Sequence, residues 1–553
     1  MQQNRAPIDA FRRDGDRRGD RKVLMLDTPV FGAAAVAAPH SLASEAGRAI
    51  LAEGGNAIEA MVAMAATIAV VYPHMNGIGG DGFWLVHEPG GRMHGIEACG
   101  PAGSSATIER YRSKDYDAIP ARGPEAALTV AGAVGGWRLA LELAAALGGR
   151  LPLRDLLGDA ARHAREGYTV SPSECRNRPN ELQALKAAPG FLDAFWPEEA
   201  APKPGTQRRM AALADTLQQL ADAGLDDFYR GDVGREIAAD LERIGAPVIR
   251  ADLERFHARS VTPLSLALPG LTVWNMPPPT QGLAALVILG LFERLGRVER
   301  DSFAHHHGLI EATKRALAIR DRHVTDPAHA TGDPASWLGE AMLAREAAMI
   351  DGRRAASWPV KESHGDTVWM GAIDRKGLAV SYIQSIYWEY GSGCVLPATG
   401  IHWQNRGTSF SLDPAAANPL MPGRKPFHTL NPAFARFDDG RILPYGSMGG
   451  DGQPQFQAQI LARYRLGQSL AAAVDAPRWL FGRTWGSAST ALKFEDRFDP
   501  ALLERLAAAG HPVEETGEAY SEGFGHAGML VKHPGGRVEA VHDPRSDGDS
   551  RGI

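Results

Sequence analysis

Residues 363–387 read SHGDTVWMGAIDRKGLAVSYIQSIY, in which two apolar runs flank the four residues DRKG. Asp374–Gly377 has the sequence of a type I turn followed by a glycine in the left-handed region, a common hairpin connection. In that hairpin residue 374 faces residue 378, so Thr367 is predicted to lie opposite Ser385. Cross-strand partners have Cβ atoms about 5 Å apart. Two hydroxyls would then meet at the open end of the hairpin, although these residues alone favour an ordinary Thr–Ser pair.

The chain changes character at this hairpin. Helical patterns dominate from about residue 137 to 350, and short runs with the period of strands follow from Thr367 onward. Nearer the N-terminus, residues 58–71 read IEAMVAMAATIAVV, which predicts a buried core helix capped by Asn56. We therefore expect a layered α/β protein in which large sheets are covered by helices.

The composition is that of a soluble globular protein. The 553 residues are 44% hydrophobic and 22% charged, with a formal net charge of −6. Because positive and negative charges are nearly balanced, we expect no strong attraction for nucleic acid or anionic lipid. A membrane helix needs about 20 apolar residues, whereas residues 58–71 are fewer and include Glu59. Cys99, Cys175 and Cys394 are too few and too far apart for a disulfide framework, which suits a reducing compartment.

Residues 1–26 carry no recognisable targeting signal. Basic and acidic residues alternate there, and the apolar run that a secretory signal needs is missing. We predict a mobile N-terminal tail over 1–26. Together with the lack of a membrane span, this favours a cytoplasmic protein.

Several familiar sites are excluded by their context. GIGGDGF at 77–83 follows a helix and opens a strand, whereas a dinucleotide-binding turn has the opposite order. Neither a P-loop nor the G-x-S-x-G of α/β-hydrolases occurs. His305, His306 and His307 occupy consecutive helical positions and would point in three directions, partly exposed at a helix start. We expect neither a metal nor a cofactor.

A set of motifs in this chain closely resembles the gamma-glutamyltransferase family. The resemblance runs in order from about residue 28 to 545. It implies an α/β fold, the N-terminal nucleophile hydrolase αββα sandwich with additional helices. The motifs are GGNAIEAMVAMAATIAVVYPHMNGIGGDGFWLV at 54–86, MPPPTQG at 276–282, EATKRALAIRDRHVTDP at 311–327, DTVWMGAIDRKGLAVS at 366–381, YGSGCVLPATGI at 390–401, PGRKPFHTLNP at 422–432 and GSMGGDGQPQ at 446–455.

The resemblance also implies that the chain cuts itself between Asp366 and Thr367. A large fragment, 27–366, and a small one, 367–553, would remain one intertwined catalytic unit. A threonine hydroxyl is a weak nucleophile, but a freed α-amine with a pKa near 8 can take its proton. Thr367 would thus supply nucleophile and base, and Ser385 would hydrogen-bond it. The backbone N–H groups of Gly449 and Gly450 would bind the oxyanion.

Departures from the family pattern concern the substrate. The family clamps an α-amino acid with an arginine, which is Glu97 here, with two serines and with an acid for the ammonium group. An arginine at position 406 could instead bind a carboxylate bidentately, and a structural or rim role for it is the alternative. The candidate substrate-binding residues are Tyr387, Arg406, Ser409, His428 and Thr429.

Within the family, the sequence after Asp366 looks most like the oxamate amidohydrolases of purine-degrading bacteria. This implies hydrolysis of the small amide oxamate to oxalate and ammonia by a heterodimer of the chain's own two fragments. Whether two such heterodimers associate stays open. The alternatives are a gamma-glutamyl hydrolase or transferase, a glutaryl-type (cephalosporin) acylase and, outside enzymes, an uncleaved binding protein.

Overall fold

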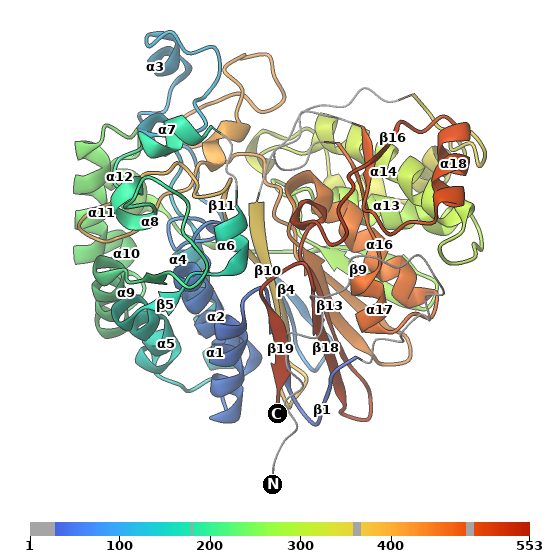
Figure 1. Ribbon diagram of the computed structural model, residues 1–553, viewed down its shortest axis with the longest axis horizontal. Coiled ribbons are helices and arrows are strands. Elements are labelled where there is room, and N and C mark those ends of the chain that lie inside the picture. The colour runs from blue at the N-terminus through green and yellow to red at the C-terminus, as the bar shows by residue number, and fades with distance from the viewer. Residues whose placement is uncertain (1–27, 178–180, 358–365, 483–490) are drawn as a thin grey trace.

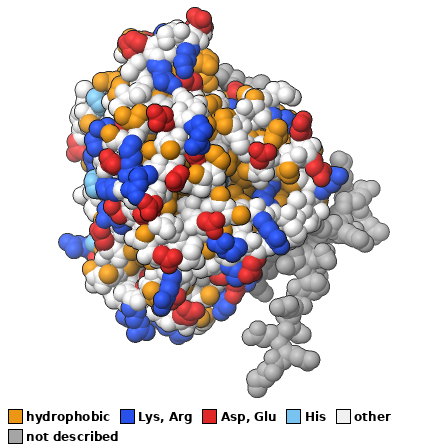
Figure 2. Space-filling model, turned by 90° about the vertical axis from the view of Figure 1, so that its left-hand side faces the viewer, with side chains coloured by type: hydrophobic (Ala, Val, Ile, Leu, Met, Phe, Trp, Pro, Cys, Tyr) orange, Lys and Arg blue, Asp and Glu red, His pale blue; other side chains and the backbone are white. Residues whose placement is uncertain are grey.

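The computed structural model describes residues 28–177, 181–357, 366–482 and 491–553. The predicted tail over 1–26 and residues 363–365, just before the predicted cut, lie outside these ranges. Within them, every helix is too short or too polar to cross a membrane. On the face seen in Figure 2, basic and acidic side chains are interspersed, as the nearly balanced net charge leads one to expect.

Two seven-stranded sheets lie face to face at the centre of the molecule (Figure 1). Every pairing that the described residues form within these sheets is antiparallel. The first has the order β19 (Asp549–Gly552), β2 (Ala35–Ala38), β10 (Asp366–Ile373), β11 (Ala379–Tyr387), β3 (Asp81–His87), β4 (Met93–Ala98) and β7 (Arg259–Val261). The second has the order β1 (Val30–Phe31), β18 (Val538–His542), β17 (Ala527–Lys532), β13 (Ile442–Ser447), β12 (Ala433–Phe437), β9 (Leu271–Asn275) and β8 (Leu264–Leu268).

Large apolar side chains fill the space between the sheets. Phe83 and Trp369 of the first sheet share one buried cluster with Phe434 and Leu530 of the second. Face-to-face sheets bury one face of each strand in this way. Figure 1 shows β10 near the middle of the molecule, and at the end of the hairpin away from the turn Thr367 and Ser385 are buried.

Helices cover the outer face of each sheet, which makes the fold the predicted αββα sandwich with additional helices. The first layer includes α1 (Ser41–Ala52), α2 (Ala57–Val71), α4 (Ala133–Ala146), α5 (Leu153–Glu166) and α9 (Ala211–Ala223). The second includes α13 (Gly282–Arg294), α14 (Phe303–His323), α16 (Gln453–Arg465) and α17 (Leu470–Asp475). Further elements are α3 (Ile108–Arg112), α6 (Pro172–Arg176), α7 (Leu182–Lys186), α8 (Phe191–Phe195), α10 (Asp227–Arg230), α11 (Asp232–Arg243), α12 (Arg250–Arg255), α15 (Glu340–Ala347), α18 (Pro500–Ala508), β5 (Tyr168–Thr169), β6 (Gln207–Arg208), β14 (Trp479–Phe481), β15 (Leu492–Phe494) and β16 (Val513–Glu515).

The predicted core helix is α2, and its local sequence explains its start. The Asn56 side chain accepts hydrogen bonds from the N–H groups of Ile58 and Glu59, and Glu59 bonds back to the Asn56 N–H. This capping box satisfies donors that a helix start otherwise leaves unpaired. All fifteen residues of α2 are buried, as expected for a helix that is apolar on every side.

The predicted hairpin between β10 and β11 is confirmed. Gly377 has φ 89°, the left-handed value that the turn requires, and the Asp374 N–H donates to the Leu378 carbonyl at 3.0 Å. The Asp374 carboxylate also accepts from the N–H of Ala57 at 3.2 Å, which links the turn to the start of α2. The turn therefore fixes both the register of the hairpin and its position against the helical layer.

One part of the chain differs from the prediction. Helical patterns were expected to dominate from 137 to 350, but β7, β8 and β9 lie between Arg259 and Asn275. In β8, buried and exposed residues alternate strictly, which is the period of a strand with one covered face. These strands are short and lie at or near sheet edges. Their sequence signal is therefore weak beside the strong helical patterns on either side.

Candidate active site

Thr367 lies in β10, where the ladder with β11 becomes irregular. The predicted register holds from the turn as far as Val368, which pairs with Gln384. One residue further, two residues of β11, Ser385 and Ile386, stand opposite Thr367 alone. The predicted Thr367–Ser385 opposition is thus modified by a β-bulge, a device that re-aims side chains near active sites.

The Thr367 side chain is fully buried and is held by a residue from the second helical layer. Nε2 of Gln453, the first residue of α16, donates to Thr367 Oγ1 at 3.3 Å. The hydroxyl of the candidate nucleophile is therefore held from outside its own hairpin.

Ser385 is buried beside the bulge. Its Oγ accepts a hydrogen bond from the Tyr387 N–H at 2.8 Å, and Tyr387 has φ 82°, a left-handed value that is unusual for a tyrosine. On its other side, Ser385 pairs across the sheet with Asp81 of β3. Strained backbone beyond a bulge brings Tyr387 into this part of the molecule.

Gly449 and Gly450 lie just before α16, where Gly450 opens a short 3₁₀ turn, Gly450–Gly452. Their φ angles are 118° and 52°, and a Cβ on Gly449 would lie only 2.7 Å from the Phe456 ring. Glycine is therefore required at position 449 on two counts. The N-terminal end of α16 follows directly, and it carries the partial positive charge of the helix dipole. Because Gln453 at that end contacts Thr367, the glycines and the candidate nucleophile belong to one site.

Arg406 is buried in this site, not at its rim. It opens a short 3₁₀ turn, Arg406–Ser409, and its side chain is only 1% exposed. Its Nη1 donates to Thr429 Oγ1 at 3.2 Å, and its guanidinium carbon lies 3.6 Å from the centre of the Tyr387 ring. Among the described residues, its Nη2 has no hydrogen-bond partner. Burial lowers the pKa of Arg406 to about 10, so the side chain still carries its charge at neutral pH.

His428 and Asp81 form a second polar pair beside Arg406. His428 Nε2 lies 3.3 Å from Asp81 Oδ2, and both residues are fully buried. Burial, reinforced by the charge of Arg406, lowers the pKa of His428 well below its ordinary value, so the imidazole is neutral. Burial also raises the pKa of Asp81 to about 7.

Ser409 lies at the edge of this group. It is half-buried, and its Oγ donates to the carbonyl of Phe427 at 3.1 Å, directly before His428. Thr429 is fully buried and accepts from Arg406. The predicted substrate-binding residues thus come together, although they derive from separate segments of the chain.

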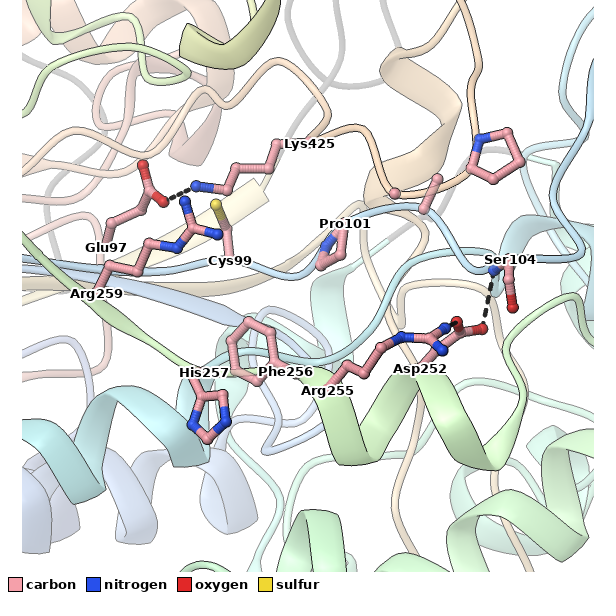
Figure 3. A pocket seen from close by; sticks show the side chains of 13 residues that line it. Glu97, Cys99, Pro101, Ser104, Asp252, Arg255, Phe256, His257, Arg259 and Lys425 are labelled. Carbon is pink, nitrogen blue, oxygen red and sulfur yellow. Dashed lines mark hydrogen bonds and ion pairs between the residues drawn. The ribbon is translucent and has the colours of Figure 1, made fainter.

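A pocket of about 320 Å³ adjoins Glu97, which replaces the expected arginine. Figure 3 shows Lys425 reaching across to the Glu97 carboxylate, with which it forms an ion pair. Cys99 and Arg259 line the same pocket. Glu97 is therefore neutralised by a neighbouring lysine.

Comparison with known proteins identifies the family of this chain. Residues 43–553 match the family described as gamma-glutamyltranspeptidase. The chain belongs to the gamma-glutamyltranspeptidase family. It is 51% identical over 517 residues to the oxamate amidohydrolase proenzyme of Klebsiella pneumoniae, across 93% of this chain and 97% of that protein.

Two further relatives extend this similarity. The glutathione hydrolase-like YwrD proenzyme of Bacillus subtilis is 37% identical, across 94% of this chain and 98% of the relative. The crystal structure of cephalosporin acylase from Bacillus halodurans superposes with a TM-score of 0.85 at 32% identity. It covers 97% of this chain and 99% of that one, so the αββα fold of the family is present throughout.

Some residues that connect the site were not anticipated, although each lies in a family motif. Gln453 Oε1 accepts from the Asn431 N–H at 3.2 Å, and Asn431 Nδ2 donates to the Thr429 carbonyl at 2.9 Å. Through these bonds the residue that holds Thr367 is connected to the one that holds Arg406. Their amide side chains, which must find hydrogen-bond partners when buried, are the signal that could have indicated them.

A second connection runs through Gln281. Its Nε2 donates to the carbonyls of Thr429 at 2.8 Å and Gly450 at 2.7 Å. Its Oε1 accepts from Arg320, which also forms an ion pair with Asp451 at 3.1 Å. The family motif at 311–327 therefore contributes to the site by fixing the backbone around the glycine pair.

The prediction for the three consecutive histidines was wrong in part. His305, His306 and His307 are each only 1% exposed. His305 and His306 both face Asp301, whereas His307 faces His511 near α18. The expected exposure was wrong because side chains from α16 and from the segment after α18, distant in sequence, cover this helix start.

Proposed function

We propose that this protein is a self-processing amidohydrolase that cuts its own chain between Asp366 and Thr367. The two fragments would stay together as one heterodimeric catalytic unit. The processed protein would hydrolyse a short amide that carries a carboxylate, best represented by oxamate, to oxalate and ammonia. The similarity to the Klebsiella oxamate amidohydrolase proenzyme supports this assignment.

In this mechanism the freed α-amine of Thr367 takes the proton of its own Oγ. Oγ then attacks the amide carbon and forms an ester bond, while the C–N bond breaks and the proton leaves with ammonia. Water then attacks the ester carbonyl, its OH stays on the acyl group, and one of its protons restores the Thr367 hydroxyl as oxalate leaves. A threonine needs such an adjacent base because its hydroxyl is a poor nucleophile at neutral pH.

The oxyanion of each tetrahedral intermediate would be bound by backbone N–H groups of Gly449 and Gly450. Their left-handed geometry and the start of α16 support this role, because such donors are fixed before the negative charge develops. Gln453 would orient the Thr367 hydroxyl. Ser385, across the bulge, would hydrogen-bond the nucleophile.

The observation that carries the choice of substrate is the buried guanidinium of Arg406. It forms no ion pair with a carboxylate among the described residues, and its Nη2 has no hydrogen-bond partner there. A buried charge without a partner is costly unless a ligand supplies the opposite charge. A substrate carboxylate bound there would account for this arginine. Ser409, which lacks a charge, matches a substrate without an α-ammonium group.

A glutaryl-type acylase is the second candidate. A glutaryl amide also presents one carboxylate and no ammonium group, so Arg406 would suit it as well. The uncharged Ser409 offers no partner for the α-ammonium group of glutathione, which favours this alternative over a glutathione hydrolase. The chain also resembles the cephalosporin acylase in fold and sequence.

The test is direct turnover by purified, processed protein. Ammonia release from oxamate should exceed release of glutamate from glutathione and of glutarate from a glutaryl amide. Preferred hydrolysis of the glutaryl amide would establish the second candidate. Preferred hydrolysis of glutathione would overturn the proposal that Arg406 selects a carboxylate substrate without an α-ammonium group.

A further inference from the structure

Asp81 is a buried carboxyl group that the mechanism above does not use. It is the first residue of β3 and pairs across the sheet with Ser385, which stands beside Thr367 at the bulge. Paired residues on neighbouring strands project to the same face of a sheet. The Asp81 carboxyl therefore shares a face with the second hydroxyl of the site, one strand further from the nucleophile.

The orientation of this carboxyl is fixed by three donors on one of its oxygens. Oδ1 accepts from the N–H of Gly132 at 3.0 Å, the N–H of Gly100 at 3.2 Å and Nε2 of Gln404 at 3.2 Å. Among the described residues, Oδ2 accepts no hydrogen bond, and it lies 3.3 Å from His428 Nε2. The free oxygen is thus directed toward a predicted substrate-binding residue.

The charges near this oxygen do not allow two anions at once. Arg406 is the buried cation that acts on Asp81, while the neighbouring Lys425 is already paired with Glu97. An ionised Asp81 would be balanced by Arg406, but a substrate carboxylate would then add a second negative charge. Burying an uncompensated charge is strongly unfavourable. A proton on Asp81 removes the conflict.

We propose that Asp81 is a positioning residue of the substrate pocket that must carry a proton when the anionic substrate binds. The proposal rests on the proposed function, since it requires a substrate carboxylate at Arg406. A proton on Oδ2 would lie between Asp81 and His428 Nε2. The His428 proton would then sit on Nδ1, where it can donate a hydrogen bond to the substrate, whereas an ionised Asp81 would reverse this tautomer.

The surroundings of Asp81 leave few other groups to titrate near neutral pH. Burial raises the pKa of Cys99 beyond β4, of Tyr229 in α10 and of Tyr382 in β11, so these stay neutral. His428 is neutral because burial lowers its pKa. Arg406 stays charged. Besides the amine of Thr367, Asp81 itself therefore changes charge around pH 7.

The pH dependence of kcat/KM on oxamate tests this inference. Deprotonation of the Thr367 amine should make kcat/KM rise with pH, and deprotonation of Asp81 should make it fall. Above both pKa values the parent enzyme should lose about tenfold per pH unit. Asp81→Asn, which resembles the protonated acid, should reach a plateau instead.

Two further variants complete the experiment. Asp81→Ser also lacks the carboxylate and should likewise lose the falling limb, so one processed variant of the two suffices. Asp252→Asn removes a buried carboxylate from the adjacent pocket, where it pairs with Arg255 and not with Lys425, and should keep the falling limb. Each variant is first checked for its two fragments on a gel.

The outcomes separate the inference from the proposed function. If the parent hydrolyses oxamate but the Asp81 variants keep the falling limb, the inference is overturned and the function stands. The same holds if Asp252→Asn abolishes that limb. If the processed parent neither hydrolyses oxamate nor binds oxalate, the proposed function fails and the inference fails with it.

Discussion

The candidate site has a nucleophile end and a substrate end, and the two contain different kinds of side chain. At the nucleophile end, Thr367, Ser385 and Gln453 are neutral and are held by a strand ladder and amide hydrogen bonds. At the substrate end, Arg406 and Asp81 are buried ionisable groups on separate segments. Burying a neutral hydroxyl or amide costs little free energy when its hydrogen bonds are satisfied, whereas burying a charge costs much more. The nucleophile end can therefore be complete without substrate, whereas the substrate end is completed by a ligand.

This difference predicts where substitutions act. Changes at the nucleophile end should affect both self-cleavage and turnover, because in the proposed mechanism both reactions would use the same hydroxyl. Changes at the substrate end should spare self-cleavage and alter turnover, because Arg406 and its neighbours would contact the small-molecule substrate and not the peptide bond.

The largest effect is expected for Thr367→Ala. The variant should remain a single chain and lack amidase activity, because the hydroxyl and the amine that the cut exposes are both lost. Parent protein should give two fragments, the smaller beginning with Thr367 on N-terminal sequencing. An alanine variant that still separates into the same fragments would show that another group performs the cut.

The next effect isolates the substrate end. Arg406→Ala should be processed normally but lose at least about tenfold in kcat/KM for oxamate, because a hydrogen bond to a charged group is worth about 1.5–3 kcal/mol. Arg406→Lys should recover only part, since a point charge cannot reproduce the planar fork. If Arg406→Ala is processed and keeps the parent rate, the carboxylate binds elsewhere, and His428 is the next residue to test.

A smaller effect is expected for Gln453→Leu. Loss of its hydrogen bond to Thr367 should lower kcat about three- to tenfold, since a neutral hydrogen bond contributes about 0.5–1.5 kcal/mol. KM should change little, because this side chain orients the nucleophile. Gln459→Leu is the matched control: Gln459 is buried on the same helix but donates to Trp479. A larger kcat loss in the control would contradict the assigned role.

The sequence was informative where structure is determined locally. The turn at Asp374–Gly377 and the alternation around it predict the hairpin, and the capping box predicts α2. The bulge at Thr367 could not be predicted, because it depends on what packs beyond the strand end. Asp81 was overlooked since it lies in a glycine-rich motif, and its role depends on Arg406 and His428, which are distant in sequence and adjacent only in the fold.

The smallest effect expected is none: chelation should change neither activity nor the melting temperature. Two clusters, Asp301 with His305 and His306, and Glu311 with His307 and His511, have the residue types and spacing for a metal. If a metal were bound at either cluster, chelation would lower the melting temperature and added zinc would restore it. That result would contradict the prediction.

Both clusters already contain a cation from the protein. Lys314 Nζ lies 2.7 Å from Glu311 Oε1, and Arg463 Nε lies 3.0 Å from Asp301 Oδ1. His307 is engaged on both sides: Nε2 donates to the Asp351 carbonyl at 2.7 Å, so Nδ1 accepts from His511 at 2.8 Å. A divalent ion would have to displace these partners and would be repelled by the fixed positive charges. We therefore expect the histidines to serve packing and hydrogen bonding, since in the proposed mechanism the freed amine of Thr367 would supply the base.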